Sequence, residues 1–153
     1  MTDKHESPAL DALLGAAGIS PGATVETRLM GTDPAMVEAI IAVIANGEKS
    51  ATFSLPWVNE HEGRAAPQVG QLIAVMDTTG TARVLLRLTA TEPLTFGTIG
   101  EAHVAREGKA LRELGPWRDL HRAVWTGKLA PLGRSVSDDM PVCMEVFEVL
   151  AIA

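Results

Sequence analysis

The feature that most constrains this chain is a glycine-led turn between an apolar helix and a short alternating strand. Asp33-Pro34 pairs a favoured N-cap with a favoured first helical residue. Aliphatic side chains then recur at helical spacing, at Val37, Ile40, Ile41 and Ile44. Asn46-Gly47 is typical of a helix that ends in a left-handed residue. The pattern therefore predicts a helix that leads directly into the strand Ser50 to Leu55.

The predicted strand has one apolar face and one hydroxyl face. Ala51, Phe53 and Leu55 alternate with Ser50, Thr52 and Ser54, so we expect the first set to face a core. The hydroxyl row would then lie beside Lys49. Such a lysine is either a solvated charge on a surface hairpin or part of a polar site, where it acts as a base or holds an anion. These residues alone leave both interpretations open.

The rest of the chain predicts three further strands. Val69 to Met76 and Ala82 to Glu92 flank Asp77-Thr78-Thr79-Gly80, which is typical of a hairpin turn. Pro93 is expected to end the second of these strands, and a last strand is expected from Val142 to Ile152.

Helices and loops are expected between these strands. Residues 1–30 indicate a short helix or a mobile arm, followed by one domain over residues 31–153. Helices are predicted at Ile99–Glu107 and from Pro116 to Trp125, with loops over residues 56–67 and 126–140. Short strands without regular βαβ alternation predict an α+β fold, in the form of a small, mostly antiparallel barrel with flanking helices.

Composition narrows the classes of function. The net charge of −6 argues against non-specific nucleic-acid binding, but residues 101–134 hold seven Lys or Arg and four acids. This segment is either a local basic face or an ordinary solvated helical surface. The lone Cys143 cannot form an internal disulfide and is expected to be buried, so we predict a cytoplasmic protein. The longest apolar run, Ala39 to Ala45, is too short to cross a bilayer.

Metal and phosphate-loop chemistry find no support in the sequence. The four histidines show no His-x-x-x-His pairing, so we predict no metal site and no cofactor. Gly47-Glu48-Lys49-Ser50 ends like a P-loop, but here a helix precedes it and a strand follows, which is the reverse of the required order.

Five motifs, in order over residues 30 to 150, resemble ASCH-domain proteins, and in particular a longer bacterial branch of this PUA-like family. The first is Gly47-x-Lys49-Ser50-Ala51-Thr52, which is similar to the family's Gly-x-Lys-[Ser/Thr]-x-Thr. The others are Pro67-Gln68-Val69-Gly70, Pro93-Leu94-Thr95-Phe96, Trp117-Arg118-Asp119-Leu120-His121 and Asp139-Met140-Pro141-Val142. The signature's frequent arginine, five residues after the lysine, is replaced here by Ser54.

The resemblance implies a PUA-like fold whose cleft receives RNA or a nucleobase. One small bacterial branch hydrolyses the acyl amide of acetylcytidine with a lysine, a threonine three residues later and a glutamate. These roles would fall on Lys49, Thr52 and Glu107, with Glu101 as the alternative glutamate. Other members are ribonucleases.

The sequence therefore leads to three hypotheses that share one site, of which the third is RNA cleavage in the same cleft. The first is binding of RNA or a modified nucleoside in a polar cleft. The second is amide hydrolysis, in which Lys49 activates Thr52 and backbone amides of the Gly47 turn stabilise an oxyanion. Glu107 would either position the lysine or pass a proton to the departing amine. A lysine within reach of Thr52 Oγ1 would favour an enzyme, and a groove of arginines would favour RNA. The further candidate contacts are Ser50, Ser54, Trp57, Arg106, Arg118, His121 and Arg122.

Overall fold

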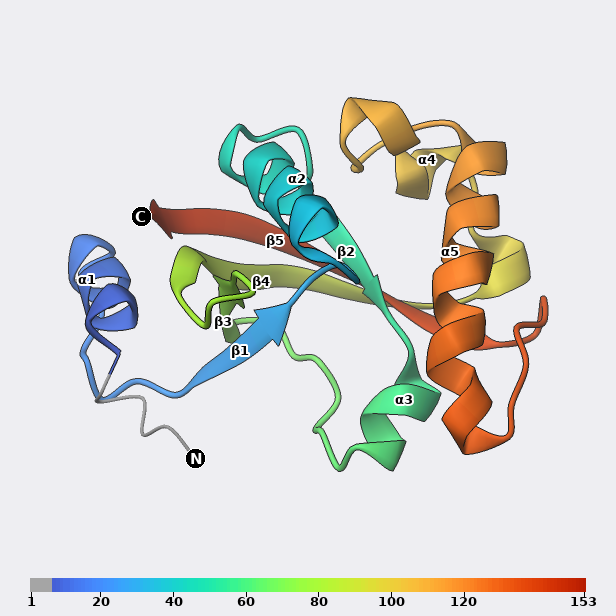
Figure 1. Cartoon of the computed structure of the whole chain (residues 1–153), viewed down its shortest axis with the longest axis horizontal. Helices are drawn as coiled ribbons and strands as arrows, with labels where there is room; N and C mark the ends of the chain where they lie inside the picture. Colours follow the sequence, from blue (N-terminus) through green and yellow to red (C-terminus); the bar gives the residue numbers. More distant parts are fainter. Residues whose placement is uncertain (1–6) are drawn as a thin grey trace. The chain divides into compact units, whose positions relative to one another are not determined.

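The computed structural model describes residues 7–153, and in this part of the chain five strands form one sheet (Figure 1). The strand order is β1-β3-β4-β5-β2, with β1 parallel to β3 and antiparallel pairing in β3–β4 and β2–β5. The α+β prediction is confirmed, but a closed barrel is not, because the order begins at β1 and ends at β2. The strands are β1 (Val25–Leu29), β2 (Ala51–Ser54), β3 (Leu72–Met76), β4 (Ala82–Thr95) and β5 (Pro141–Ile152).

The described residues also contain five α-helices and three short 3-10 helices. The α-helices are α1 (Pro8–Ala16), α2 (Pro34–Ala45), α3 (Pro56–His61), α4 (Glu101–Val104) and α5 (Leu114–Leu129). The 3-10 helices are Phe96–Thr98, Lys109–Leu111 and Ala130–Leu132.

Helix α2 and the turn after it form as the sequence predicts. The Asp33 side chain accepts a hydrogen bond from the Met36 amide at 2.9 Å, which caps the helix. Gly47 has φ of +84°, a left-handed conformation that costs glycine little and turns the chain toward β2.

The N-terminal region is more ordered than predicted. Helix α1 is capped by Ser7 and buries Leu10, Leu13 and Leu14. Strand β1 lies in the region predicted to be a short helix or a mobile arm, and it pairs with β3. A parallel pairing leaves no hairpin signal in the sequence, which is why β1 escaped prediction. Residues 1–6 of the predicted arm lie outside the described residues.

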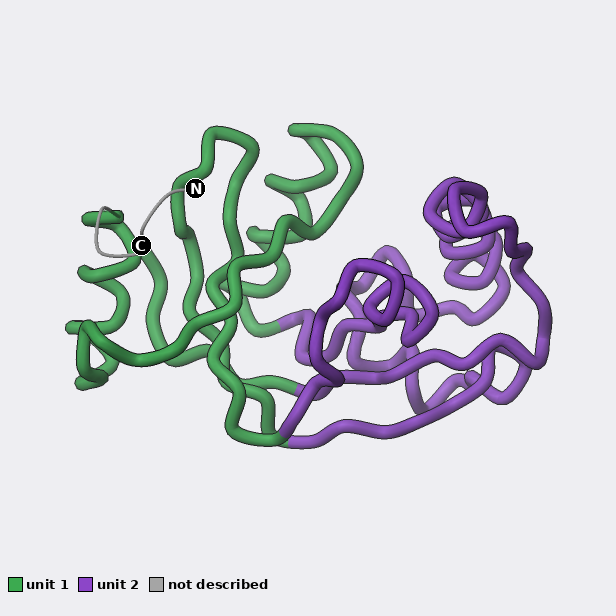
Figure 2. Tube along the Cα trace, turned by 90° about the horizontal axis from the view of Figure 1, so that it is seen from below, with its two compact units in different colours: residues 1–47, 69–89, 147–153 green, residues 48–68, 90–146 purple. Residues whose placement is uncertain are grey.

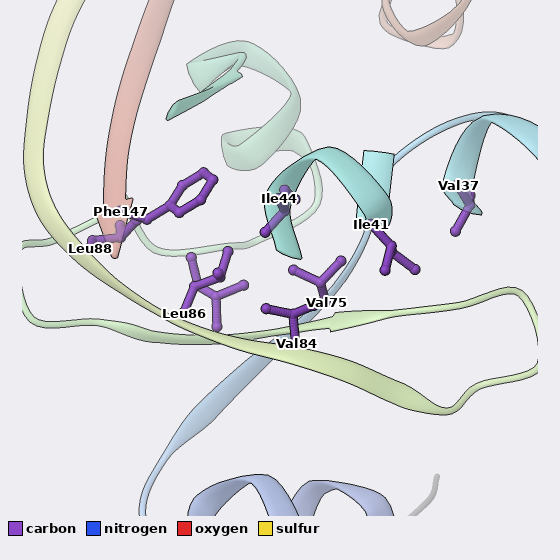
Figure 3. Close-up of a cluster of buried hydrophobic side chains, with 9 residues drawn as sticks. Val37, Ile41, Ile44, Val75, Val84, Leu86, Leu88 and Phe147 are labelled. Carbon is purple, nitrogen blue, oxygen red and sulfur yellow. The ribbon is translucent and has the colours of Figure 1, made fainter. Parts of the chain in front are cut away.

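The chain divides into two compact units, shown in Figure 2. The first comprises residues 1–47, 69–89 and 147–153. Within it, the stripe of α2 packs on β3 and β4, and Figure 3 shows Ile44 near Phe147 and Val75 near Val84. Burying each such aliphatic side chain contributes about 1.5–3 kcal/mol.

At the β3–β4 hairpin, hydrogen bonds from Thr79 and Thr81 lower the pKa of Asp77 to about 2.

The second unit comprises residues 48–68 and 90–146, and it contains every candidate side chain named above. Its core is aromatic, with Phe96, Trp117 and Trp125 buried among aliphatic side chains. Strands β4 and β5 run from one unit into the other.

Several elements in this unit differ from prediction. Residues 56–61 form α3 rather than loop, because Pro56 is a favoured first helical residue and Trp57 and Val58 pack on the aromatic core. Strand β4 continues past Pro93 to Thr95, and α5 extends to Leu129, which is buried in the same core. The helix predicted over residues 99–107 shortens to α4, because the chain turns at Ala105 toward β2.

Candidate functional site

A buried ion pair joins the turn before β2 to the segment after α4. Lys49 Nζ donates to Glu107 Oε1 at 2.7 Å, although the two residues are 58 positions apart in the sequence. Lys49 is 8% exposed and Glu107 is 2% exposed. Two charges enclosed together in this way carry a large desolvation cost that only close mutual contact offsets.

Backbone hydrogen bonds hold these two segments against each other. The Ser50 amide donates to the Arg106 carbonyl at 2.9 Å. The Arg112 side chain reaches back across the turn and donates to the Glu107 carbonyl at 2.8 Å and the Glu48 carbonyl at 3.2 Å. The position of the ion pair is therefore fixed by the chain on both sides of it.

A histidine from α5 lies in an aromatic environment on the Phe53 side of β2. The His121 ring stacks on Trp117 with centroids 4.0 Å apart and an interplanar angle of 20°. The edges of Trp125 and Phe53 approach at centroid distances of 4.9 and 6.3 Å. His121 Nδ1 lies 2.8 Å from the Trp117 carbonyl oxygen, which can only accept, so Nδ1 carries the proton.

The charges that influence the pKa of His121 include both members of the ion pair. Burial lowers the pKa of His121 from its ordinary 6.5, and the hydrogen bond to Trp117 and the charge of Glu107 partly oppose that effect. The charges of Lys49 and Lys128 lower the pKa further. The imidazole is therefore neutral at pH 7, with its Nε2 lone pair available.

The β2 hydroxyl assigned to the site, that of Thr52, lies on the face of the sheet that also carries Glu145. Thr52 is half-buried and lies directly opposite Glu145 of β5, which is fully buried, so their side chains share a face of the sheet. Phe53, the next residue, points to the other face. Within residues 7–153, no hydrogen bond joins Thr52 to Lys49, and the buried Ser54 Oγ makes none.

The predicted basic contacts divide into two groups. Arg106 is exposed and donates to Ser50 Oγ at 3.3 Å, next to the ion pair. Arg118 instead lies 4.3 Å over the Phe96 ring and donates to the Phe96 carbonyl at 2.8 Å. Arg122 lies 5.2 Å over the same ring. Arg118 and Arg122 therefore surround Phe96, and of the three arginines only Arg106 contacts the Lys49 segment.

Trp57 lines a separate pocket. Its ring lies 4.1 Å from the guanidinium of Arg134, which covers one face of it. The pocket has a volume of about 300 Å³ and is lined by Trp57, Glu60, His61, Leu132 and Arg134, none of which belongs to the ion pair.

The structure also bears on the choice between Glu107 and Glu101 and on the backbone amides of the Gly47 turn. Glu107 contacts Lys49, whereas Glu101 is exposed in the first turn of α4. The Gly47 amide donates to the Ile44 carbonyl at 3.2 Å as part of the helix end. The amide of Gly47 itself is therefore occupied, and stabilisation of an oxyanion by the backbone amides of this turn stays a prediction.

Comparison with known proteins decides the family. A family model described as the ASCH domain matches residues 26–151. The chain belongs to the ASCH-domain family. The predicted resemblance is thereby confirmed over nearly all of the chain.

Solved structures agree with this assignment. An ASCH domain from Lactobacillus crispatus JV V101 superposes with a TM-score of 0.84 at 23% identity, over 99% of this chain and 96% of that one. A protein from Enterococcus faecalis V583 superposes with a TM-score of 0.81 at 21% identity, over 94% and 86% of the two chains. At these identities the likeness establishes the fold. No curated protein matches the sequence significantly.

Two residues of this ASCH domain near the site were not predicted. Glu145 had no specific signal beyond being a carboxylate inside an apolar strand, and its burial follows from the pairing of β5 with β2. Arg112 follows a 3-10 helix, and only the folded chain brings it to Glu107 and Glu48.

Residues 7–153 lack both a metal-binding cluster and a membrane-spanning helix. These residues contain no cluster of three His, Cys, Asp or Glu side chains placed to hold a metal ion. They also contain no helix with the length and apolar character needed to cross a membrane.

Proposed function

We propose that this ASCH domain binds RNA or a modified nucleoside at a polar site formed by Lys49, Thr52 and Glu107. The observation that carries the proposal is the buried Lys49–Glu107 ion pair. Replacing such a pair with apolar residues is often neutral or stabilising, so stability alone does not explain why a domain holds one. We therefore infer a functional role for the two enclosed charges.

The groups around the ion pair match the chemistry of a nucleotide. Arg106 presents an exposed guanidinium beside Ser50, and guanidinium groups recognise phosphate through paired N–H donors. Single-stranded RNA and free nucleosides offer the base edges and hydroxyls that polar side chains read. The positive balance of residues 101–134 favours the same class of ligand.

A second candidate is hydrolysis of the acyl amide of an acetylcytidine-type nucleoside. The near-complete enclosure of Lys49 and Glu107 favours it, because an enclosed site strengthens electrostatic interactions with a reacting group. With a proton moved from Lys49 to Glu107, Thr52 Oγ1 would attack the acyl carbon while the neutral Lys49 takes the hydroxyl proton. Lys49 would pass that proton to the departing amine and recover its own from Glu107, and water would then release the acyl group from Thr52. RNA cleavage is the third possibility for the same site.

Titration of the wild-type protein with cytidine, acetylcytidine and a short single-stranded RNA tests the proposal. The three tryptophans provide a fluorescence signal, and chromatography and a denaturing gel detect hydrolysis of either substrate. We expect saturable binding that the double variant Lys49→Met/Glu107→Met weakens by at least about tenfold. Arg87→Met, an exposed change in the other unit, is the matched control and should leave affinity unchanged. Equal binding by the double variant would refute the site.

A further inference from the structure

We propose that His121 is a hydrogen-bond acceptor on the Phe53 face of β2, beside the two helical segments that flank Glu107, with Nε2 receiving a hydrogen bond from an N–H or O–H group of the bound ligand. This inference rests on the proposed function for the identity of the ligand. It assigns His121 a specific chemical role, where the sequence indicated only a general contact.

The orientation of the His121 ring is fixed by its contacts. Nδ1–H donates to the Trp117 carbonyl one helical turn earlier in α5, and the ring plane is held by its stack on Trp117. The edges of Trp125 and Phe53 limit rotation from two other directions. A histidine with Nδ1 occupied in this way can present only Nε2 to a ligand.

The Nε2 atom of His121 remains available to accept a hydrogen bond. In residues 7–153 the one hydrogen bond of His121 is made by Nδ1, and the side chain is half-buried rather than enclosed. Lys49 Nζ, by contrast, already donates to Glu107 at 2.7 Å. The charged Lys49 has no lone pair and Glu107 is 2% exposed, so the neutral acceptor open to a ligand is Nε2 of the half-buried His121.

Neighbouring charges act on the protonation of the His121 imidazole. Lys49 and Lys128 act against protonation of the ring, Glu107 acts in favour of it, and burial among aromatic rings disfavours the charged form. The packing elements β2 and α5 otherwise present aromatic side chains to it. A ligand donor would meet a neutral acceptor, and acidification would convert that acceptor into a competing donor.

The acceptor role can be tested without any ligand. Long-range ¹H–¹⁵N NMR of the histidine rings should show His121 as the Nδ1–H tautomer, with Nε2 unprotonated at pH 7. Its titration midpoint should lie below the ordinary histidine value of 6.5. His121→Asn provides the assignment. An Nε2–H tautomer or a midpoint above 6.5 would overturn the inference.

Ligand binding supplies the second test. His121→Asn keeps an amide that can donate to the Trp117 carbonyl but lacks an atom at the Nε2 position, whereas His121→Gln places an amide near it. We expect His121→Asn to weaken binding of cytidine or the RNA about threefold to tenfold, with partial recovery in His121→Gln. Wild-type affinity should fall as His121 is protonated, and this pH dependence should be absent from His121→Asn. Unchanged affinity and pH dependence in His121→Asn would overturn the role, whereas no wild-type binding would refute the proposed function and leave the tautomer result to decide the inference.

Discussion

Removing one partner of the Lys49–Glu107 pair should destabilise the domain far more than removing both. At 2.7 Å the two charges attract by about 6 kcal/mol at the effective dielectric constant that suits protein sites. Most of this energy offsets the cost of taking the charges out of water. Lys49→Met removes the attraction but leaves Glu107, which is 2% exposed, without its counter-charge. We therefore expect Lys49→Met or Glu107→Met to lower the free energy of unfolding by about 3–5 kcal/mol.

The double variant Lys49→Met/Glu107→Met removes both charges and leaves two apolar side chains of similar length. It should cost less than either single change and is expected to lie near the wild type. Urea unfolding followed by tryptophan fluorescence measures all four proteins, and thermal unfolding provides a second reading. For a domain of this size, each single change corresponds to a fall in Tm of about 6–20 °C.

The wild type, the two single variants and the double variant form a double-mutant cycle. The coupling free energy from this cycle tests whether the two charges stabilise each other. We expect single-variant losses that exceed the double-variant loss, with a coupling of at least about 2 kcal/mol. Additive losses, or single losses below about 1 kcal/mol, would show that the pair is hydrated in solution and behaves as a surface salt bridge. Arg87→Met is again the control, because its ion pair with Glu148 is exposed and should contribute little.

Two further predictions concern pH and packing. Because the folded state lowers the pKa of His121 below 6.5, the unfolded chain binds the proton more readily, so the free energy of unfolding should fall as the pH drops below about 6.5. His121→Phe should reduce that slope in urea titrations at several pH values, and an unchanged slope would contradict the assignment. Gly97→Ala should destabilise by about 1–3 kcal/mol, because a Cβ there would lie 2.9 Å from the Asp138 Cβ and 3.1 Å from its carbonyl oxygen. Gly127→Ala, in α5 with open space around it, should instead stabilise by up to about 1 kcal/mol, and equal effects at the two glycines would contradict the packing argument.

The parts of the fold that could be predicted are those with local signals. Asp33 and Gly47 mark the two ends of α2, and alternation identifies β2, because cap and strand preferences act over a few residues. Strand β1 was missed because its partner β3 lies more than forty residues away and no turn joins them. The continuation of β4 past Pro93 likewise depends on tertiary context.

The candidate site shows the same division. Lys49 and Glu107 were identified through the family resemblance, since periodicity cannot show that residues 58 positions apart are in contact. The aromatic surroundings of His121 come from α5 and β2 packing together, and no sequence pattern encodes the direction in which its Nε2 points. Arg118 was predicted as a ligand contact from its motif, but its guanidinium lies on Phe96.

Chemical-shift mapping of the ¹⁵N-labelled domain during titration with single-stranded RNA or acetylcytidine tests the central claim most directly. The account predicts that the largest saturable shifts cluster at Lys49, Ser50, Thr52, Glu107 and the ring nitrogens of His121. It also predicts that Lys49→Met/Glu107→Met, which should remain folded, abolishes them. Shifts confined to the Trp57–Arg134 pocket, or to residues 69–89 in the other unit, would contradict it.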